Sequence, residues 1–110
     1  MRPDAVRGHL DALILSVLER EPLHGYAVMQ ALQRSSGGAL DLPTGSLYPA
    51  LRRLERAGYL QSEWRMVGGR KRRSYELTTA GRRALARERS EWRDFAAVVE
   101  GVLRPGTAQA

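Results

Sequence analysis

The sequence predicts a mainly α-helical protein that carries one small β-hairpin. Two observations lead to this prediction: apolar residues recur with a helical period through most of the chain, and the period changes to two between residues 60 and 78. A length of 110 residues corresponds to one domain with a single core, which a second copy of the chain could complete.

The first helical segment lies in residues 10–18. Its apolar residues fall at i, i+3, i+4, i+7 and i+8, which gives the helix a broad buried stripe made of Leu10, Leu13, Ile14, Val17 and Leu18. We expect this helix to end near Glu19 to Glu21, because Pro22 disfavours helical geometry in the residue before it.

A second helix is predicted to begin near His24 and to close at the run Ser35-Ser36-Gly37-Gly38. Gly25 lies on its apolar face, where the missing side chain lets a neighbouring helix approach closely. Tyr26 points the other way, so it is either a donor to a DNA phosphate or a partly packed surface tyrosine.

The third helix, in residues 44–58, has one apolar face and one cationic face. The apolar stripe is made of Leu47, Leu51 and Leu54, and the residues on the opposite side are Pro49, Arg52, Arg53 and Arg56. Thr44 or Ser46 can cap the first turn, and with Ser46 as the cap Pro49 takes the third helical position, where its missing N–H breaks no bond. Gly58 is expected to end the helix. The arginines are either a solvated outer face or a surface for a polyanion.

After Gly58 the pattern indicates a β-hairpin. Residues 60–66 and 73–77 alternate as strands do, and the intervening segment Val67–Arg72 contains two glycines that allow a turn. The tip carries four consecutive cations, Arg70, Lys71, Arg72 and Arg73, whose mutual repulsion favours an anionic partner.

A helix-turn-helix followed at once by a basic hairpin is the winged-helix arrangement. In that arrangement the third helix enters the major groove of DNA, and the wing reaches phosphates or the adjacent minor groove. The residues we expect to contact DNA are Tyr26, Thr44, Ser46, Tyr48, Pro49, Arg52, Arg53, Arg56, Arg70, Lys71, Arg72 and Arg73.

The last predicted element is a long helix that a threonine at residues 78–79 can cap and that runs to about Leu103. Its apolar residues form a heptad-like seam made of Leu85, Trp92, Phe95, Val99 and Val102. A helix of about 25 residues measures roughly 37 Å and would overhang so small a body, so we expect it to pack against a second copy; the alternative is that it folds back on its own domain. The expected division is 1–77 as the DNA-binding domain, 78–103 as the dimerisation helix and 104–110 as a disordered tail.

The composition narrows the class of protein. Lys and Arg number 18 against 12 Asp and Glu, and the resulting pI near 10.7 favours nucleic acid or an anionic membrane surface as partner. No apolar run approaches the roughly 18 residues that span a bilayer, and the N-terminus beginning Met1-Arg2-Pro3-Asp4 leads into no signal peptide, so a cytoplasmic protein is expected. The chain has no cysteine, and His9 and His24 lie too far apart to suggest a zinc pair. We expect no metal, no cofactor and no enzymatic activity, because no catalytic constellation is visible.

Several short motifs resemble the PadR family of bacterial transcriptional regulators. They are Leu23-His24-Gly25-Tyr26, the run from Gly45 to Glu55 with Gly58, and Gly68-Gly69-Arg70-Lys71 with Tyr75, Leu77-Thr78 and Gly81. The resemblance spans residues 10 to 103, and its Leu-Tyr-Pro-x-Leu-x-Arg-Leu-Glu run joined to a Gly-Gly-Arg wing is specific.

The resemblance implies a homodimeric winged-helix repressor of the compact branch, whose C-terminal helix forms the dimer and which binds an inverted-repeat operator in double-stranded DNA. In multidrug-binding members of that branch a tryptophan of this helix stacks on planar aromatic ligands, and Trp92, eleven residues after Gly81, falls at the matching place. Trp92 is therefore either a contact for a small aromatic effector or a packed residue of the seam. The alternative function is a winged-helix module that binds an acidic protein, which predicts saturable protein binding and no preference for DNA sequence.

Overall fold

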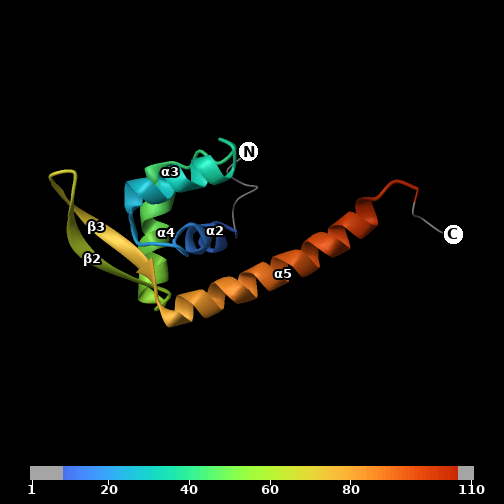
Figure 1. The fold of residues 1–110 in the computed structure, drawn as a ribbon. Coiled ribbons are helices and arrows are strands. Elements are labelled where there is room, and N and C mark those ends of the chain that lie inside the picture. The colour runs from blue at the N-terminus through green and yellow to red at the C-terminus, as the bar shows by residue number, and fades with distance from the viewer. Residues whose placement is uncertain (1–8, 107–110) are drawn as a thin grey trace.

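The structure is a computed structural model that describes residues 9–106. Two parts of the chain lie outside the described residues: residues 1–8, for which no signal peptide was expected, and residues 107–110 of the expected tail. The described chain is mainly helical with a small antiparallel sheet, as predicted (Figure 1). Its elements are α2 (Leu10–Val17), β1 (Leu23–His24), α3 (Gly25–Ser35), α4 (Thr44–Arg56), β2 (Leu60–Val67), β3 (Arg70–Leu77) and α5 (Thr79–Leu103).

The apolar stripes of the predicted helices meet in one core. Its largest fully buried side chains come from α2 and its C-cap residue, from α3 and from α4, and are Ile14, Leu15, Leu18, Val28, Leu32, Leu47 and Leu51. Tyr75 and Leu77 of β3 close the core on the sheet side. Burial of this apolar area is the main force that holds the short helices together, because helices of this length are marginal in isolation.

The first helix ends earlier than expected, and the reason is a strand that the sequence pattern did not reveal. α2 stops at Val17, with Leu18 as its C-cap, rather than near Glu19 to Glu21. The chain must then turn towards the sheet, where β1 pairs antiparallel with β3 in the register Leu23↔Tyr75 and His24↔Ser74. The resulting sheet has the order β1-β3-β2.

His24 lies at the junction between β1 and α3 and serves as the helix cap. Its Nδ1 accepts a hydrogen bond from the backbone N–H of Ala27 at 3.3 Å. Burial, and secondly the positive charge of Arg72, lowers the pKa of His24. The lowered pKa favours the neutral imidazole, which is the form that has a ring nitrogen free to accept.

Gly25 fulfils the packing role expected of it, and its neighbour is Tyr48 of α4. A Cβ placed on Gly25 would lie 2.5 Å from Cε1 of the Tyr48 ring, well inside van der Waals contact. A larger residue here would have to displace the Tyr48 ring, so this glycine lets the ring lie directly against the start of α3.

The cap predicted for α4 was wrong. The helix begins at Thr44, the cap position is Pro43, and no side chain makes a capping hydrogen bond. Pro49 consequently lies inside the helix and not at its third position, so the carbonyl of Gly45 loses its helical partner. Gly45 is exposed, which allows water to satisfy that carbonyl. The predicted end was right: Gly58 has φ +85°, and the N–H of Tyr59 donates to the carbonyl of Leu54 at 3.0 Å.

The hairpin, hereafter the wing, has a tighter turn than predicted. β2 and β3 are joined by Gly68 and Gly69 alone, with φ of +57° and +77°, the combination that a two-residue hairpin turn requires. Residues 70–72 therefore belong to β3 and not to the loop. Because side chains alternate along a strand, the four cations fall on two faces, with Lys71 and Arg73 on one and Arg70 and Arg72 on the other.

α5 begins and ends where the sequence predicted. Thr78 caps it by accepting from the N–H of Gly81 at 3.0 Å, and its hydroxyl donates to the carbonyl of Gly58 at 2.6 Å. A Cβ on Gly81 would lie 2.1 Å from the carbonyl oxygen of Tyr59, so α5 is seated directly on the backbone before β2. The helix then projects away from the other elements (Figure 1). Because of this projection the whole molecule is elongated and measures 64 × 28 × 21 Å along its principal axes.

The root of α5 is not part of the exposed seam. Leu85 was expected there, but it is only 3% exposed and packs in the core of its own chain, together with Ala84. The reason is that α5 crosses α2 before it projects, so its first turns cover the helical core. Within residues 9–106 no helix is apolar enough over sufficient length to cross a bilayer.

Candidate nucleic-acid interface

The outer face of α4 is a solvent-exposed line of residues at helical spacing. Gly45, Pro49, Arg52 and Arg56 follow one another at i, i+4, i+7 and i+11, and all are exposed, whereas the leucines on the other side are buried. In the part of the chain that the structure describes, no hydrogen bond or ion pair engages Arg52 or Arg56. Both guanidinium groups are thus available to a ligand.

Arg53 differs from its neighbours because it is already paired. Its Nη2 forms an ion pair with the carboxylate of Asp11 on α2. Thr44 and Ser46 are exposed in the first turn of α4. Tyr48 is 36% exposed and lies against Gly25, and Tyr26 on α3 is 49% exposed.

The wing combines cations with an exposed aromatic residue. The indole of Trp64, 57% exposed, has the Nζ of Lys71 at 5.6 Å and the guanidinium carbon of Arg73 at 5.4 Å from its ring centroid. Both are cation–π distances. Trp64 pairs with Arg73 in the strand register, so all three side chains lie on the face of the hairpin that carries Tyr75.

A chain of polar contacts joins the wing to α4. The Nε of Arg73 donates to the hydroxyl of Ser62 at 2.8 Å, and that hydroxyl donates to Oε2 of Glu55 at 2.5 Å. The Nη2 of Arg73 also lies 3.6 Å from Oε2 of Glu55. Sequence reasoning did not find Glu55 or Ser62, because the contact depends on how the hairpin packs on the helix.

An open groove separates α4 from the wing. It is lined by Arg52, Glu55, Arg56, Arg73 and Tyr75. Tyr75 is buried, and this burial raises the pKa of its hydroxyl. Of the predicted cations, Arg52 and Arg56 of the helix and Arg73 of the wing thus line one groove, whereas Arg53 faces Asp11. The other wing cations, Arg70, Lys71 and Arg72, lie outside its lining.

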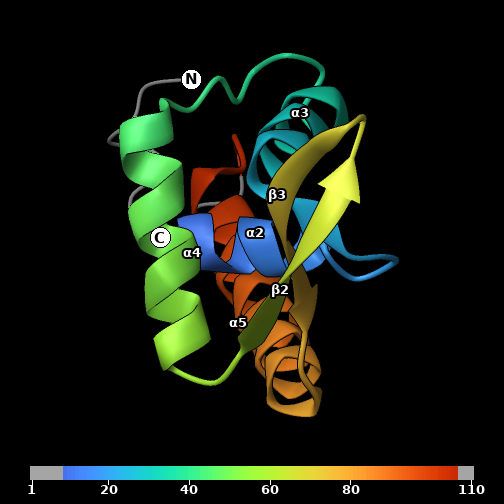
Figure 2. The ribbon, with the colours of Figure 1, turned by 90° about the vertical axis from the view of Figure 1, so that its left-hand side faces the viewer.

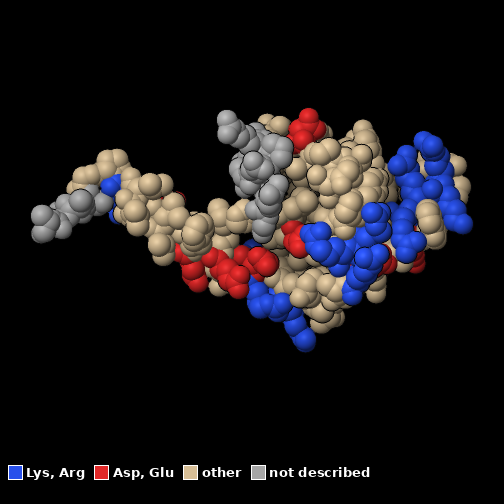
Figure 3. Space-filling model, turned by 180° about the vertical axis from the view of Figure 1, so that it is seen from behind, with Lys and Arg blue, Asp and Glu red and all other residues tan. Residues whose placement is uncertain are grey.

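Positive charge is concentrated at this end of the molecule. Figures 1 and 2 place α4 and the hairpin together, opposite the free end of α5, and Figure 3 shows Lys and Arg gathered over the hairpin end. Asp and Glu are visible along α5 in the same view. A surface of this kind attracts a polyanion by long-range electrostatics.

The projecting half of α5 exposes large apolar side chains. Their exposed fractions reach 53% for Trp92, 57% for Phe95 and 78% for Val102, and Val99 is partly buried. The Trp92 ring contacts Phe95 at 6.0 Å and His9 at 5.4 Å between centroids. These residues are spaced as i, i+3, i+7 and i+10, which is the a/d seam of a coiled coil.

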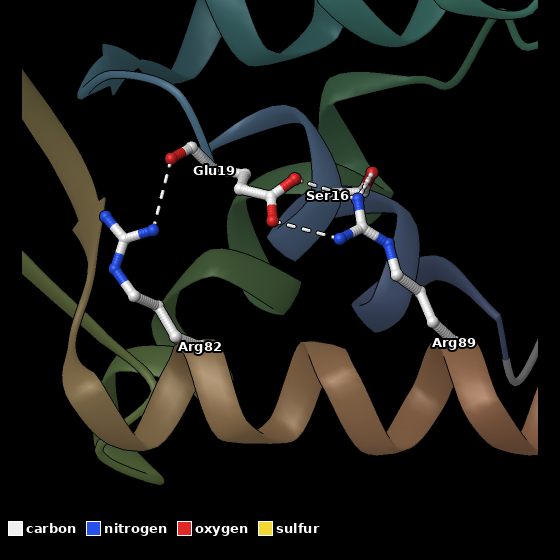
Figure 4. Close-up of polar contacts among 4 residues, drawn as sticks. All are labelled: Ser16, Glu19, Arg82 and Arg89. Carbon is white, nitrogen blue, oxygen red and sulfur yellow. Dashed lines mark hydrogen bonds and ion pairs between the residues drawn. The ribbon is translucent and has the colours of Figure 1, made fainter.

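Polar contacts hold the first half of α5 against the end of α2 and the segment that follows it (Figure 4). Arg89 donates to both carboxylate oxygens of Glu19 at 2.9 Å and to the hydroxyl of Ser16 at 3.3 Å. Arg82 donates to the backbone carbonyl of Glu19 at 3.2 Å. The hydrogen bond from Arg89 lowers the pKa of Glu19.

Residues 9–106 hold no group of three or more histidines, acidic residues or cysteines that could bind a metal ion. The geometry described so far defines a winged-helix protein with a basic face that spans its third described helix and its wing.

Comparison with known proteins gives the family. The sequence model of the PadR-like family of transcriptional regulators matches residues 14–87. The chain is 41% identical over 97 residues to the transcriptional regulator Rv3488 of Mycobacterium tuberculosis, which covers 88% of this chain and 84% of that protein.

Solved structures agree. A PadR family transcriptional regulator from Eggerthella lenta has a TM-score of 0.81 at 35% identity, covering 94% of this chain and 88% of that one. A transcriptional regulator from Clostridium thermocellum has a TM-score of 0.84 at 26% identity, covering 92% and 99%. The chain belongs to the PadR-like family of transcriptional regulators, a family of DNA-binding regulators and not of enzymes. The predicted family and the winged-helix fold are confirmed.

Proposed function

We propose that this chain is a sequence-specific regulator that reads the major groove with α4 and binds phosphates with its wing. The observation that carries the proposal is the shared groove, in which the free guanidinium groups of Arg52 and Arg56 face the wing. Guanidinium groups recognise guanine edges and phosphates. The N-terminal turn with Thr44 and Ser46, together with Arg70, Lys71 and Arg72 of the wing, completes the proposed contact surface.

The test is a fluorescence anisotropy titration on duplex DNA taken from the region that flanks the protein's own gene. A specific regulator should bind one such duplex at least about a thousandfold more tightly than a random duplex of equal length at physiological salt. Equal affinity for both would overturn sequence-specific recognition. Saturable binding to an acidic protein, without any DNA preference, would support the alternative protein-binding module.

The proposal includes a homodimer formed by residues 78–103 of two copies, with residues 1–77 of each copy binding DNA. It is supported by the apolar seam of α5, in which Trp92, Phe95 and Val102 are exposed and Val99 is half-buried. The heptad spacing of this seam is self-complementary across a two-fold axis. Two α4 helices related in this way address half-sites about one helical turn apart, roughly 34 to 36 Å, so the operator should be an inverted repeat.

The dimer can be tested by sedimentation of matched variants. Phe95→Asp places a charge in the seam and should yield a monomer, whereas Ala97→Asp places the same charge on the exposed opposite side of α5 and should leave the dimer intact. A Phe95→Asp protein that still sediments as a dimer would remove the seam from the interface.

Repression is proposed because occupation of a promoter by such a dimer would exclude the transcription machinery. Deletion of the gene should raise the output of a reporter placed under the operator-bearing promoter, and a fall would indicate an activator. We further propose that Trp92 contributes a flat wall for a small aromatic effector, because two copies of this ring would face each other across the seam.

A further inference from the structure

The contacts of Arg73 separate it from the other cations of the wing. Its Nε donates a hydrogen bond to the Ser62 hydroxyl, and its Nη2 lies 3.6 Å from Oε2 of Glu55. Its guanidinium carbon lies 5.4 Å from the centroid of the Trp64 ring. Only 42% of the side chain is exposed. A guanidinium engaged by three groups of its own chain is poorly placed to bind phosphate as a free cation.

We propose that Glu55, Ser62 and Arg73 form a brace that sets the position of the wing relative to α4, and that Arg73 is a positioning residue rather than a DNA contact. The inference rests on the proposed function, because it concerns how α4 and the wing reach the same duplex.

The chemistry of the brace is directional. The Arg73 N–H donates to the Ser62 hydroxyl, and the hydroxyl proton is donated in turn to the Glu55 carboxylate. Each group is thereby used in the role it can fill, since arginine only donates, an ionised carboxylate only accepts, and serine does both. Hydrogen bonds to charged groups are shorter and stronger than neutral ones, which makes this link stiff.

The link also joins three elements at defined places. Glu55 lies in the last turn of α4, Ser62 near the start of β2 and Arg73 opposite Trp64 on β3. The Trp64 ring also holds Lys71 at 5.6 Å, so the brace orients a cation that remains exposed. Loss of the brace should therefore disturb Lys71 as well, although Lys71 makes no contact with Glu55.

The sign of one substitution separates the brace from simple electrostatics. Glu55 is a carboxylate in a groove that faces the proposed DNA. If it acted only through its charge, Glu55→Gln would tighten DNA binding, because one repulsive carboxylate is removed from the groove. As part of a brace, Glu55→Gln should instead weaken operator binding about tenfold, the equivalent of one charged hydrogen bond.

The experiment compares Glu55→Gln, Ser62→Ala and the control Glu63→Gln by anisotropy on the operator duplex. Glu63 is an exposed carboxylate on β2, next to Ser62, and its ion pair with Arg65 stays within that strand. Weaker operator binding by Glu55→Gln and Ser62→Ala, with Glu63→Gln unchanged, is the expected result. Unchanged or tighter binding by Glu55→Gln would overturn the brace.

A second readout needs no DNA, so failure of the brace and failure of the proposed function can be told apart. In a Trp92→Phe background Trp64 is the only tryptophan, and its emission reports on the face of the hairpin that Arg73 covers. Glu55→Gln should increase acrylamide quenching of Trp64, whereas Glu63→Gln should not. Equal quenching in both overturns the brace whatever the DNA result, while a wild-type protein that prefers no duplex overturns only the proposed function.

Discussion

Arg89 of α5 donates one hydrogen bond to each carboxylate oxygen of Glu19, both at 2.9 Å. The pair ties the long helix to the segment that links α2 to the sheet, and the hydrogen bond from Arg89 lowers the pKa of Glu19. The same contact raises the pKa of Arg89. Both shifts mean that folding favours the charged forms of the two groups.

This pair predicts a pH-dependent contribution to stability. Because the pKa of Glu19 is lower in the folded chain than in the unfolded chain, the contribution is fully present above the unfolded glutamate pKa of about 4.3 and is lost as pH falls through the lowered folded value. Arg89→Gln should therefore lower Tm at pH 7, and the difference from wild type should shrink below about pH 4.

Thermal melts of both proteins between pH 7 and pH 3 make the measurement. Arg87→Gln is the matched control, since it removes the same charge from an exposed position two residues earlier in α5. A Tm difference for Arg89→Gln that stays constant over this range would show that the ion pair does not stabilise the fold.

Arg52 and Arg53 are adjacent in sequence but are expected to behave differently on DNA. Arg52→Ala should lose about 1 to 3 kcal/mol of discrimination at one base pair, because its free guanidinium can reach a base edge. Arg53→Ala should have a smaller effect, since Asp11 already pairs with it. Anisotropy on the operator and on single-base variants makes the comparison. Equal affinity losses on operator and random DNA for Arg52→Ala would show that this residue contacts only the DNA backbone and no base.

The tip of the wing should contribute affinity without sequence preference. Replacing Arg70 and Lys71 by alanine is expected to weaken binding to all duplexes and to reduce the slope of log affinity against log salt by about one for every phosphate that is no longer neutralised. Titrations between about 50 and 200 mM salt measure the slope. Retention of the full wild-type slope would place the tip outside the interface.

Trp92 should report ligand binding if the two copies of its ring form a flat-walled site. In a Trp64→Phe background, titration with planar aromatic dyes should quench the remaining tryptophan emission. The operator complex should loosen by about 1 to 3 kcal/mol if the ligand prefers the DNA-incompetent arrangement.

The packed alternative makes a different prediction. A Trp92 that fills the seam leaves no volume for a guest, so no dye would change the emission and Trp92→Ala would cost about 3 to 5 kcal/mol of dimer stability. The exposed fraction of 53% in one chain is compatible with burial of this ring only when a second copy is added.

The sequence predicted the helices and the hairpin because each carries a period that its own residues reveal. The stripes of α2 and α4, the alternation of β2 and β3, and the threonine cap at Thr78 are local signals. β1 could not be predicted in this way, since two residues have no period. It exists because Leu23 and His24 find partners on β3, about fifty residues later.

The candidate site was predictable as a set of cations but not as a geometry. Residue type and spacing indicate that Arg52, Arg53 and Arg73 are exposed and positive. Which of them is free depends on partners that arrive from other elements, Asp11 for Arg53 and Glu55 for Arg73. For the same reason Leu85 could be placed on an apolar face of α5 from its spacing, whereas which chain buries it could not.

The close approach of Gly81 to the carbonyl oxygen of Tyr59 fixes the angle at which α5 leaves the rest of the chain. A rod of 25 residues is about 37 Å long, so a tilt of about 5° at its root moves its tip by roughly 3 Å. In the proposed dimer both copies of α5 would tilt by the same angle, so the two displacements would add. The result would be a change in the separation of the two α4 helices. The half-site spacing that this dimer tolerates would therefore depend in part on the absence of a Cβ at Gly81.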